Sequence, residues 1–210
     1  MIIKREEYIE KIEPFMDKHI IKVLIGVRRS GKSTILKQII DSLNSREIPK
    51  ENIVWINFEL SEYFQLNTIE KLEEFITKKI ENVDGKIYLF FDEIQLVPQW
   101  EKLINSYFAK GNYDIYITGS NSKLLSGEFA TYLSGRYIEF NIYPFSFKEY
   151  LKYYKISDNF KIHFYKFLDD GGMPSTFDYE GYDKRLIIMD LYNSIVLKDI
   201  VQRNNVQNVE

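Results

Sequence analysis

Apolar residues along this chain follow two patterns that alternate from the N-terminus to about residue 142. Some segments are short, mostly apolar and rich in β-branched and aromatic residues, which is typical of strands buried on both faces of a parallel sheet. They lie at residues 20–27, 52–58, 86–91, 113–118 and 137–142. In other segments apolar residues recur every three or four positions, which predicts helices. These segments are 5–16, 33–43, 68–80 and 99–109. The alternation predicts a doubly wound α/β fold with right-handed crossovers.

The pattern changes after Pro144, where residues 145–154, 159–169 and 183–201 all show helical spacing. A turn between two of these helices is predicted by Gly171-Gly172-Met173-Pro174. We therefore expect an α/β core over residues 1–143 and a small helical region over residues 144–210. Within the core, Pro14 is placed to end the first helix early, and Thr68 to cap the helix that follows it.

Composition narrows the class of protein. The apolar fraction of 45% and the charged fraction of 28% are ordinary for a soluble globular chain. A net charge of −3 argues against a surface coated in basic residues for nucleic acid, and leaves a local basic patch open. The chain has no cysteine, which excludes disulfides and thiolate metal sites, and its two histidines cannot make a zinc cluster alone. The acidic N-terminus argues against a signal peptide, and no run approaches the roughly 20 apolar residues that span a bilayer, so we expect a cytoplasmic protein without a membrane partner.

The strongest motif lies between the first predicted strand and the helix after it. Residues 26–33, named here the phosphate loop, read Gly-Val-Arg-Arg-Ser-Gly-Lys-Ser and fit the pattern G-x-x-x-x-G-K-[S/T], known as Walker A. Glycines let backbone N–H groups turn toward an anion, and the helix start adds its positive dipole end. A chance match in a chain of this length is on the order of one in a hundred. The residues expected to bind nucleotide are Gly26, Val27, Arg28, Arg29, Ser30, Gly31, Lys32, Ser33 and Thr34.

Individual side chains of the phosphate loop have distinct expected roles. Lys32 is expected to reach the β- and γ-phosphates, Ser33 to ligate Mg²⁺, and Thr34 to contact the α-phosphate. The alternative is a glycine turn that happens to be followed by Lys-Ser. For Arg28 and Arg29, a solvated loop tip is an interpretation at least as good as contact with a partner.

A second motif is an acidic pair at the end of an apolar strand. Residues 87–91 lead into Asp92 and Glu93. Beside a phosphate loop, this position lets Asp92 hold Mg²⁺, directly or through water, and makes Glu93 a candidate general base for the attacking water. This favours hydrolysis over transfer to another acceptor. The alternative is a solvated acidic turn after a core strand. The strand at 113–118 also ends in polar residues, where Ser120 or Asn121 is a candidate to touch the γ-phosphate or to cap a helix.

Further motifs follow in a fixed order. After GVRRSGKST come FFDEIQ with Trp100 downstream, ITGSNSKLLS, LSGRY and YPFSFKEY. Together with Gly171-Gly172-Met173-Pro174, they resemble the archaeal and bacterial AAA-type ATPases whose C-terminal half is a domain of unknown function. The resemblance runs from about residue 5 to residue 203, and the order and spacing of the motifs are what make it specific. Members usually continue past the helical region, so we expect this chain, which ends at Glu210, to be a fragment or a short member.

The resemblance implies a P-loop NTPase fold of the AAA type, with strand order 5-1-4-3-2, a helical lid over 144–210 and Mg-ATP as ligand. It implies that Lys32 and Ser33 act in the phosphate loop, that Asp92 and Glu93 are the metal and base pair (Walker B), and that Ser120-Asn121 is a sensor. Arg136 matches a family arginine that senses the γ-phosphate, in cis or from a neighbouring subunit; the alternative is a surface arginine at a strand start. The choice of ATP over GTP comes from the resemblance, and no guanine-reading Asn-Lys-x-Asp motif is present.

Three functions remain open at this point. The first is an enzyme that hydrolyses ATP with Mg²⁺ and is coupled to an unidentified DNA or protein partner, as a monomer or a homo-oligomer. The second is a nucleotide-gated switch or scaffold that hydrolyses slowly. The third is an ATPase associated with nucleic acid, because aromatic residues beside lysines in the helical region could stack single-stranded bases. The helical spacing of Phe160, Phe164 and Phe167 favours a packed core instead.

Overall fold

The computed structural model describes residues 2–120 and 133–195, and these form two compact units. The sheet unit is drawn from Glu6–Ile25 and Lys32–Asn141. The helical unit is drawn from Met1–Arg5, Gly26–Gly31 and Ile142–Glu210. The phosphate loop is therefore shared: Gly26–Gly31 belongs to the helical unit, and Lys32 begins its part in the sheet unit.

Five strands form the sheet, and their bounds lie within two residues of the predicted segments. They are β1 (Ile21–Gly26), β2 (Ile53–Asn57), β3 (Ile87–Asp92), β4 (Tyr113–Ser120) and β5 (Tyr137–Asn141). Their order is β2-β3-β4-β1-β5, which is the order 5-1-4-3-2 read from the other edge, so the predicted topology is confirmed. The pairs β2–β3, β3–β4 and β1–β5 run parallel. β1 and β3 are buried along their whole length, as strands covered on both faces must be.

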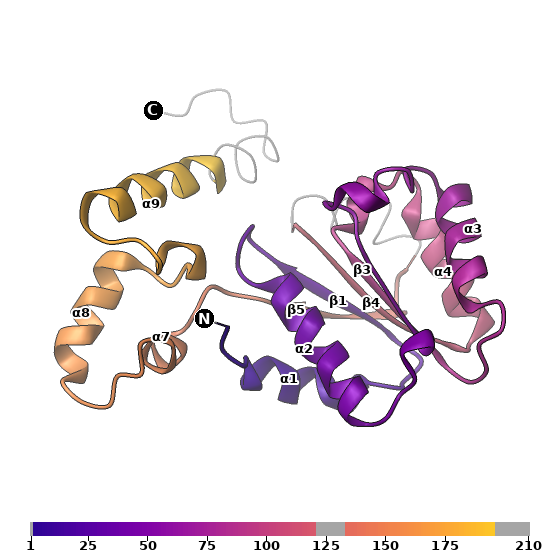
Figure 1. Ribbon diagram of the computed structural model, residues 1–210, viewed down its shortest axis with the longest axis horizontal. Coiled ribbons are helices and arrows are strands. Elements are labelled where there is room, and N and C mark those ends of the chain that lie inside the picture. The colour runs from indigo at the N-terminus through magenta and orange to yellow at the C-terminus, as the bar shows by residue number, and fades with distance from the viewer. Residues whose placement is uncertain (1, 121–132, 196–210) are drawn as a thin grey trace. The chain divides into compact units, whose positions relative to one another are not determined.

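Helices cover both faces of this sheet. In Figure 1, α3 and α4 lie together at one side of the sheet, and α1 and α2 pack together at the other. Their bounds are α1 (Glu6–Ile12), α2 (Lys32–Ser45), α3 (Ile69–Ile80) and α4 (Trp100–Lys110). As expected, the first helix ends early, because Pro14 lies in a 3₁₀ turn that follows α1. Thr68 is confirmed as the N-cap of α3, with its Oγ1 accepting from the N–H of Lys71 at 3.4 Å.

The apolar faces of the strands and helices meet in one large core. Representative members that are fully buried are Val23, Ile56, Leu72, Leu89, Ile104 and Ile117. The ammonium of Lys22 in β1 forms a buried ion pair with Asp114 in β4, and the hydroxyl of Tyr116 donates to the same carboxylate at 2.9 Å. Such a pair is tolerated in a core because each charge has its partner.

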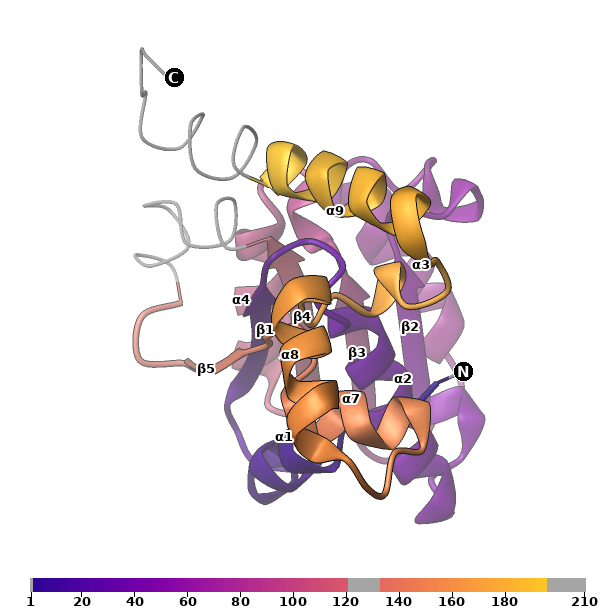
Figure 2. The same ribbon diagram turned by 90° about the vertical axis from the view of Figure 1, so that its left-hand side faces the viewer.

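The helical unit contains α7 (Phe147–Tyr154), α8 (Phe160–Asp170) and α9 (Gly181–Ile195), which follow one another in Figure 2. The prediction began the first of these helices at residue 145. The observed start is later because Ser146 forms a capping box with Glu149, which sets the first turn of α7. Beyond Ile195, the predicted extension of the last helix lies outside the described residues.

Aromatic residues fill the centre of the helical unit, though not all those predicted. Phe145, Tyr150 and Phe177 form its buried cluster, and Phe167 packs against it. The core interpretation is wrong for Phe160 and Phe164, which are 50% and 42% exposed, although the Phe164 ring packs edge-on against that of Phe147 at 5.1 Å. Among the described residues, no helix combines the length and the apolar content that crossing a bilayer requires.

Candidate functional site

Three polar side chains form a row across the carboxyl ends of neighbouring strands. The register pairs Asn57 of β2 with Asp92 of β3, and the pairing of Phe91 with Ile117 sets Thr118 of β4 beside Asp92 on the other side. Both neighbours hydrogen-bond the carboxylate: Thr118 Oγ1 donates to Oδ1 at 2.5 Å, and Asn57 Nδ2 donates to Oδ2 at 3.2 Å. The row fixes the direction of one carboxylate at the sheet edge where ligands bind in open α/β sheets.

Asp92 is fully buried, with 0% of its surface exposed. Burial raises the pKa of its carboxyl above the usual value, and hydrogen bonds from Thr118 and from Ser33 oppose this shift. The contact with Ser33 brings together the two residues that the sequence assigns to the metal. A buried carboxylate that is costly to ionise is stabilised by a cation placed beside it.

The oxygen donors present here fit magnesium. Mg²⁺ is bound in phosphoryl-transfer sites by one or two side-chain oxygens, with waters and substrate phosphates completing the octahedron. The Ser33 hydroxyl and the Asp92 carboxylate are such a pair. Within residues 2–120 and 133–195, no group of three or more acidic or histidine side chains gathers to hold a metal unaided. The arrangement therefore suits a metal that arrives with a phosphate ligand.

Glu93 has an unusual backbone for a residue with a long side chain. Its φ of 58° and ψ of 46° place it in the left-handed region, which costs an ordinary residue about 1–3 kcal/mol and is concentrated at functional sites. Its N–H donates to Thr118 Oγ1 at 3.0 Å, so the same hydroxyl holds both acids of the pair. The two carboxylates have different environments, because Asp92 is fully buried while the Glu93 side chain is 17% exposed.

Lys32 lies opposite this acid. It begins α2, is 4% exposed, and places its Nζ 3.6 Å from Glu93 Oε1. The carboxylate of Glu93 also accepts a hydrogen bond from Gln95 Nε2. The sheet unit thus assembles Lys32, Ser33, Asp92 and Glu93, which the sequence predicted, together with Thr118, which it did not.

The rest of the phosphate loop is packed too tightly to carry side chains at its first glycine. A Cβ on Gly26 would lie 2.2 Å from the carbonyl oxygen of Ile142, and Gly31 has a φ of +101°, which glycine adopts at no steric cost. Ser30 is fully buried, and no partner for its Oγ is found among the described residues. Arg28 and Arg29 are both exposed, as expected for a solvated loop tip.

Three further residues that the sequence assigns to the site are Ser120, Asn121 and Arg136. Ser120 is the last residue of β4, and its side chain is not described; Asn121 lies outside the described residues. Arg136 precedes β5 and is exposed, with its guanidinium bonded to Asn105 of α4 and placed 5.9 Å from the ring centroid of Phe108. Thr118 and Asn57 were missed because a polar residue at a strand end is an ordinary feature until the strand order is known.

This chain is similar to known proteins in sequence and in fold. A family model described as an AAA domain matches residues 18–151. An uncharacterized protein of Haemophilus influenzae is 41% identical over 210 residues, which cover 99% of this chain and 52% of that protein. An uncharacterized protein of Methanocaldococcus jannaschii is 35% identical over 204 residues, which cover 90% of this chain and 44% of that protein. The chain therefore spans about half the length of these curated relatives.

Among solved structures, the S. cerevisiae Hsp104–ADP complex is similar with a TM-score of 0.57 and 18% identity. The similarity covers 74% of this chain and 24% of that chain. At this identity the likeness concerns the fold alone.

Proposed function

The chain belongs to the AAA domain family, and from that premise we propose that it binds ATP with Mg²⁺ and hydrolyses it. The observation that carries the proposal is the polar row at the carboxyl ends of β2, β3 and β4, in which Asp92 is oriented from both sides and is followed by Glu93 in a left-handed backbone conformation. A solvated acidic turn, the alternative interpretation of this pair, would not bury Asp92 completely.

Each residue has a role that its position supports. Lys32 and the loop amides bind the triphosphate, with the lysine neutralising charge on its terminal oxygens. Ser33 and Asp92 would hold the metal, which would supply neutralisation of phosphate charge. Glu93 accepts a proton from the attacking water. Thr118 keeps both acids in place through one hydroxyl.

The contact between Lys32 and Glu93 supports a second candidate, a nucleotide-gated switch. Lys32 Nζ lies 3.6 Å from Glu93 Oε1, and Gln95 holds the other oxygen of that carboxylate. A base engaged in this way must exchange partners before it can act on water, which slows turnover until a phosphate takes Lys32 away. Slow hydrolysis that a partner accelerates would be the signature of this candidate.

Two further assignments extend the proposal. We propose that Ser120 or Asn121 senses the γ-phosphate, and that Arg136 acts on the site of a neighbouring subunit in a homo-oligomer. Exposure of Arg136 on the sheet unit is compatible with contact to another copy. The curated relatives are about twice as long as this chain. The biological partner, protein or DNA, therefore concerns the whole protein.

The decisive experiment compares Glu93→Gln with Glu74→Gln. Glu74 is an exposed residue of α3 paired only with Lys78 four residues on, so its variant controls for the chemical change. We expect Glu93→Gln to keep nucleotide binding and lower turnover by about 10²–10⁴-fold, the usual worth of a positioned general base. Lys32→Ala should lose binding. Turnover of Glu93→Gln equal to that of Glu74→Gln would refute the proposed mechanism.

A further inference from the structure

Arg5, which precedes α1 in the sequence, is buried in the helical unit together with Gly26–Gly31. Its side chain is 1% exposed, which is rare for an arginine because a buried guanidinium needs both a counter-charge and acceptors for its five N–H groups. None of the motifs used above accounts for this residue. Its partners show what it does.

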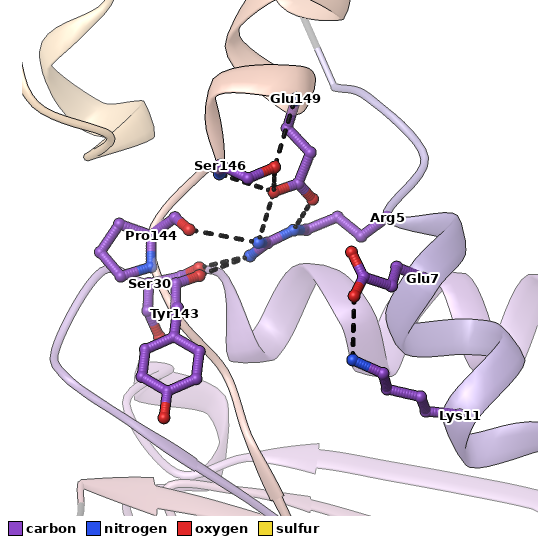
Figure 3. Close-up of polar contacts among 8 residues, drawn as sticks. All are labelled: Arg5, Glu7, Lys11, Ser30, Tyr143, Pro144, Ser146 and Glu149. Atoms are coloured by element: carbon purple, nitrogen blue, oxygen red, sulfur yellow. Dashed lines mark hydrogen bonds and ion pairs between the residues drawn. The ribbon is translucent and has the colours of Figure 1, made fainter. Parts of the chain in front are cut away.

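Figure 3 shows Arg5 at the centre of a set of acceptors from distant parts of the chain. Nε and Nη2 donate to the two oxygens of Glu149 at 2.7 and 3.0 Å, in the paired geometry that arginine and a carboxylate form best. Nη1 donates to the carbonyl oxygens of Ser30 and Tyr143 at 2.8 and 3.0 Å, and Nη2 donates to that of Pro144 at 3.5 Å. These five bonds use all five N–H donors of the guanidinium.

The bond to Ser30 fixes one amide of the phosphate loop. In a trans peptide the C=O of one residue and the N–H of the next point in opposite directions, and no cis peptide occurs among the described residues. Arg5 therefore sets the direction of the Gly31 N–H when it holds the Ser30 carbonyl. Because Gly31 has no Cβ and a φ of +101°, its own side chain does nothing to restrain this peptide plane.

The other side of the guanidinium holds the first turn of α7. Glu149 Oε2 accepts from Arg5, and also from the backbone N–H of Ser146 at 2.9 Å, where it completes the capping box of the helix. Burial would raise the pKa of Glu149, but hydrogen bonds from Arg5 and from the Ser146 backbone outweigh it, so the pKa lies below its usual value. The carboxylate stays charged and serves the loop contact and the helix cap together.

The segment that leads from Pro144 into α7 also contacts the turn at residues 171–174. The N–H of Phe145 donates to the Gly172 carbonyl at 2.7 Å, and a Cβ on Gly172 would lie 2.2 Å from the Phe145 carbonyl oxygen. The Gly171-Gly172-Met173-Pro174 turn therefore packs directly against Phe145. This residue follows Tyr143 and Pro144, whose carbonyl oxygens accept hydrogen bonds from Arg5. A displacement of α7 or of this turn would be transmitted to the Ser30 carbonyl through the side chain of Arg5.

We propose that Arg5 is a positioning residue, which aims the Gly31 amide of the phosphate loop and links nucleotide affinity to the placement of α7. The inference rests on the proposed function for its effect on affinity, while its effect on the loop stands without any nucleotide. A residue that only anchors the fold would lower stability and leave the loop and the affinity unchanged.

Two conservative variants test this. Arg5→Lys keeps the charge but has three donors at a single nitrogen, so it cannot hold Glu149 and Ser30 together. Glu149→Gln keeps the shape and loses the charge. The matched control is Arg46→Lys, because Arg46 is a partly exposed arginine that pairs with Glu13 in the sheet unit.

The first readout is hydrogen exchange of the whole protein without nucleotide. We expect the peptide spanning residues 26–33 to exchange at least about tenfold faster in both variants, while strand β3 exchanges as in the unmodified protein and Arg46→Lys changes neither. Equal loop exchange in all four proteins would overturn the proposal. This readout decides the question even if the chain bound no nucleotide, an outcome that would refute the proposed function instead.

The second readout is the equilibrium dissociation constant for Mg-ATP. Losing one aimed hydrogen bond to a charged phosphate is expected to weaken binding by about 10- to 100-fold in Arg5→Lys, with a smaller loss in Glu149→Gln. The double variant should bind no more weakly than Arg5→Lys alone, because both changes break one connection. Unchanged affinity with only a lower midpoint of unfolding would show that Arg5 merely anchors the fold, and losses that multiply would refute a shared connection through Glu149.

Discussion

Replacing Thr118 by valine removes one hydroxyl and leaves a side chain of nearly the same size. That hydroxyl donates to Asp92 Oδ1 at 2.5 Å and accepts from the N–H of Glu93 at 3.0 Å. Valine therefore takes one donor from a fully buried carboxylate and one acceptor from a backbone amide. Asn57, at 3.2 Å, and Ser33 remain as donors to Asp92.

The expected loss in the free energy of unfolding follows from these two hydrogen bonds. A hydrogen bond to a charged group contributes about 1.5–3 kcal/mol to stability, and the amide adds about 1 kcal/mol when it loses its acceptor. We expect Thr118→Val to lower the free energy of unfolding by about 2.5–4 kcal/mol at a pH where Asp92 is ionised.

The pH dependence has a definite sign. Burial raises the pKa of Asp92 above 3.8, against the hydrogen bonds of Thr118 and Ser33. A group with a raised folded pKa contributes stability that is fully present below its unfolded pKa and is lost as the pH rises through the folded pKa. Valine removes a bond that lowers this pKa, so it raises the pKa further. The difference in unfolding free energy between the two proteins should therefore grow as the pH rises through the folded pKa of Asp92, which lies above 3.8.

Urea unfolding of the nucleotide-free protein at several pH values between about 4 and 8 measures this difference. Thr176→Val is the matched control, since Thr176 is equally buried and its Oγ1 donates to a neutral acceptor, the Met173 carbonyl, at 2.8 Å. Its cost should be about 1 kcal/mol and independent of pH. The reasoning fails if Thr118→Val costs no more than this control, or if its cost stays constant with pH.

Two other predictions follow from the site. Gly26→Ala should lower the free energy of unfolding by about 3 kcal/mol, because its Cβ would lie 2.2 Å from a carbonyl oxygen, whereas Gly135→Ala, with a φ of +73° and open space around it, should cost about 1 kcal/mol in the same urea titration. Equal costs would contradict the packing argument. If Arg136 acts on a neighbouring subunit, specific activity should rise with protein concentration, and mixing Arg136→Ala with Lys32→Ala subunits should restore part of the turnover that each lacks; no restoration would exclude a role in trans.

Local patterns in the sequence were sufficient to predict the helices and strands. They also identified the candidate site residues that belong to continuous motifs. Strands such as β3 are short apolar runs, and α3 has a cap at Thr68, so each is specified by neighbouring residues. The phosphate loop and the Asp92–Glu93 pair are also continuous motifs, and the strand order came from the family that these motifs resemble. The exposure of Phe160 could not be predicted, because helical spacing shows which residues share a face and not whether another element covers it.

The sequence by itself determined that apolar strands end in polar residues and that a glycine-containing loop with a phosphate-binding motif follows the first strand, because periodicity and glycine placement act within a few residues. Only the tertiary structure decided which polar ends meet. Parallel pairing set Thr118 beside Asp92 across 26 positions of the chain, and burial joined Arg5 to Glu149 across 144. A buried charge or hydrogen-bond donor must find its partner wherever the fold places one, and no local pattern records that requirement.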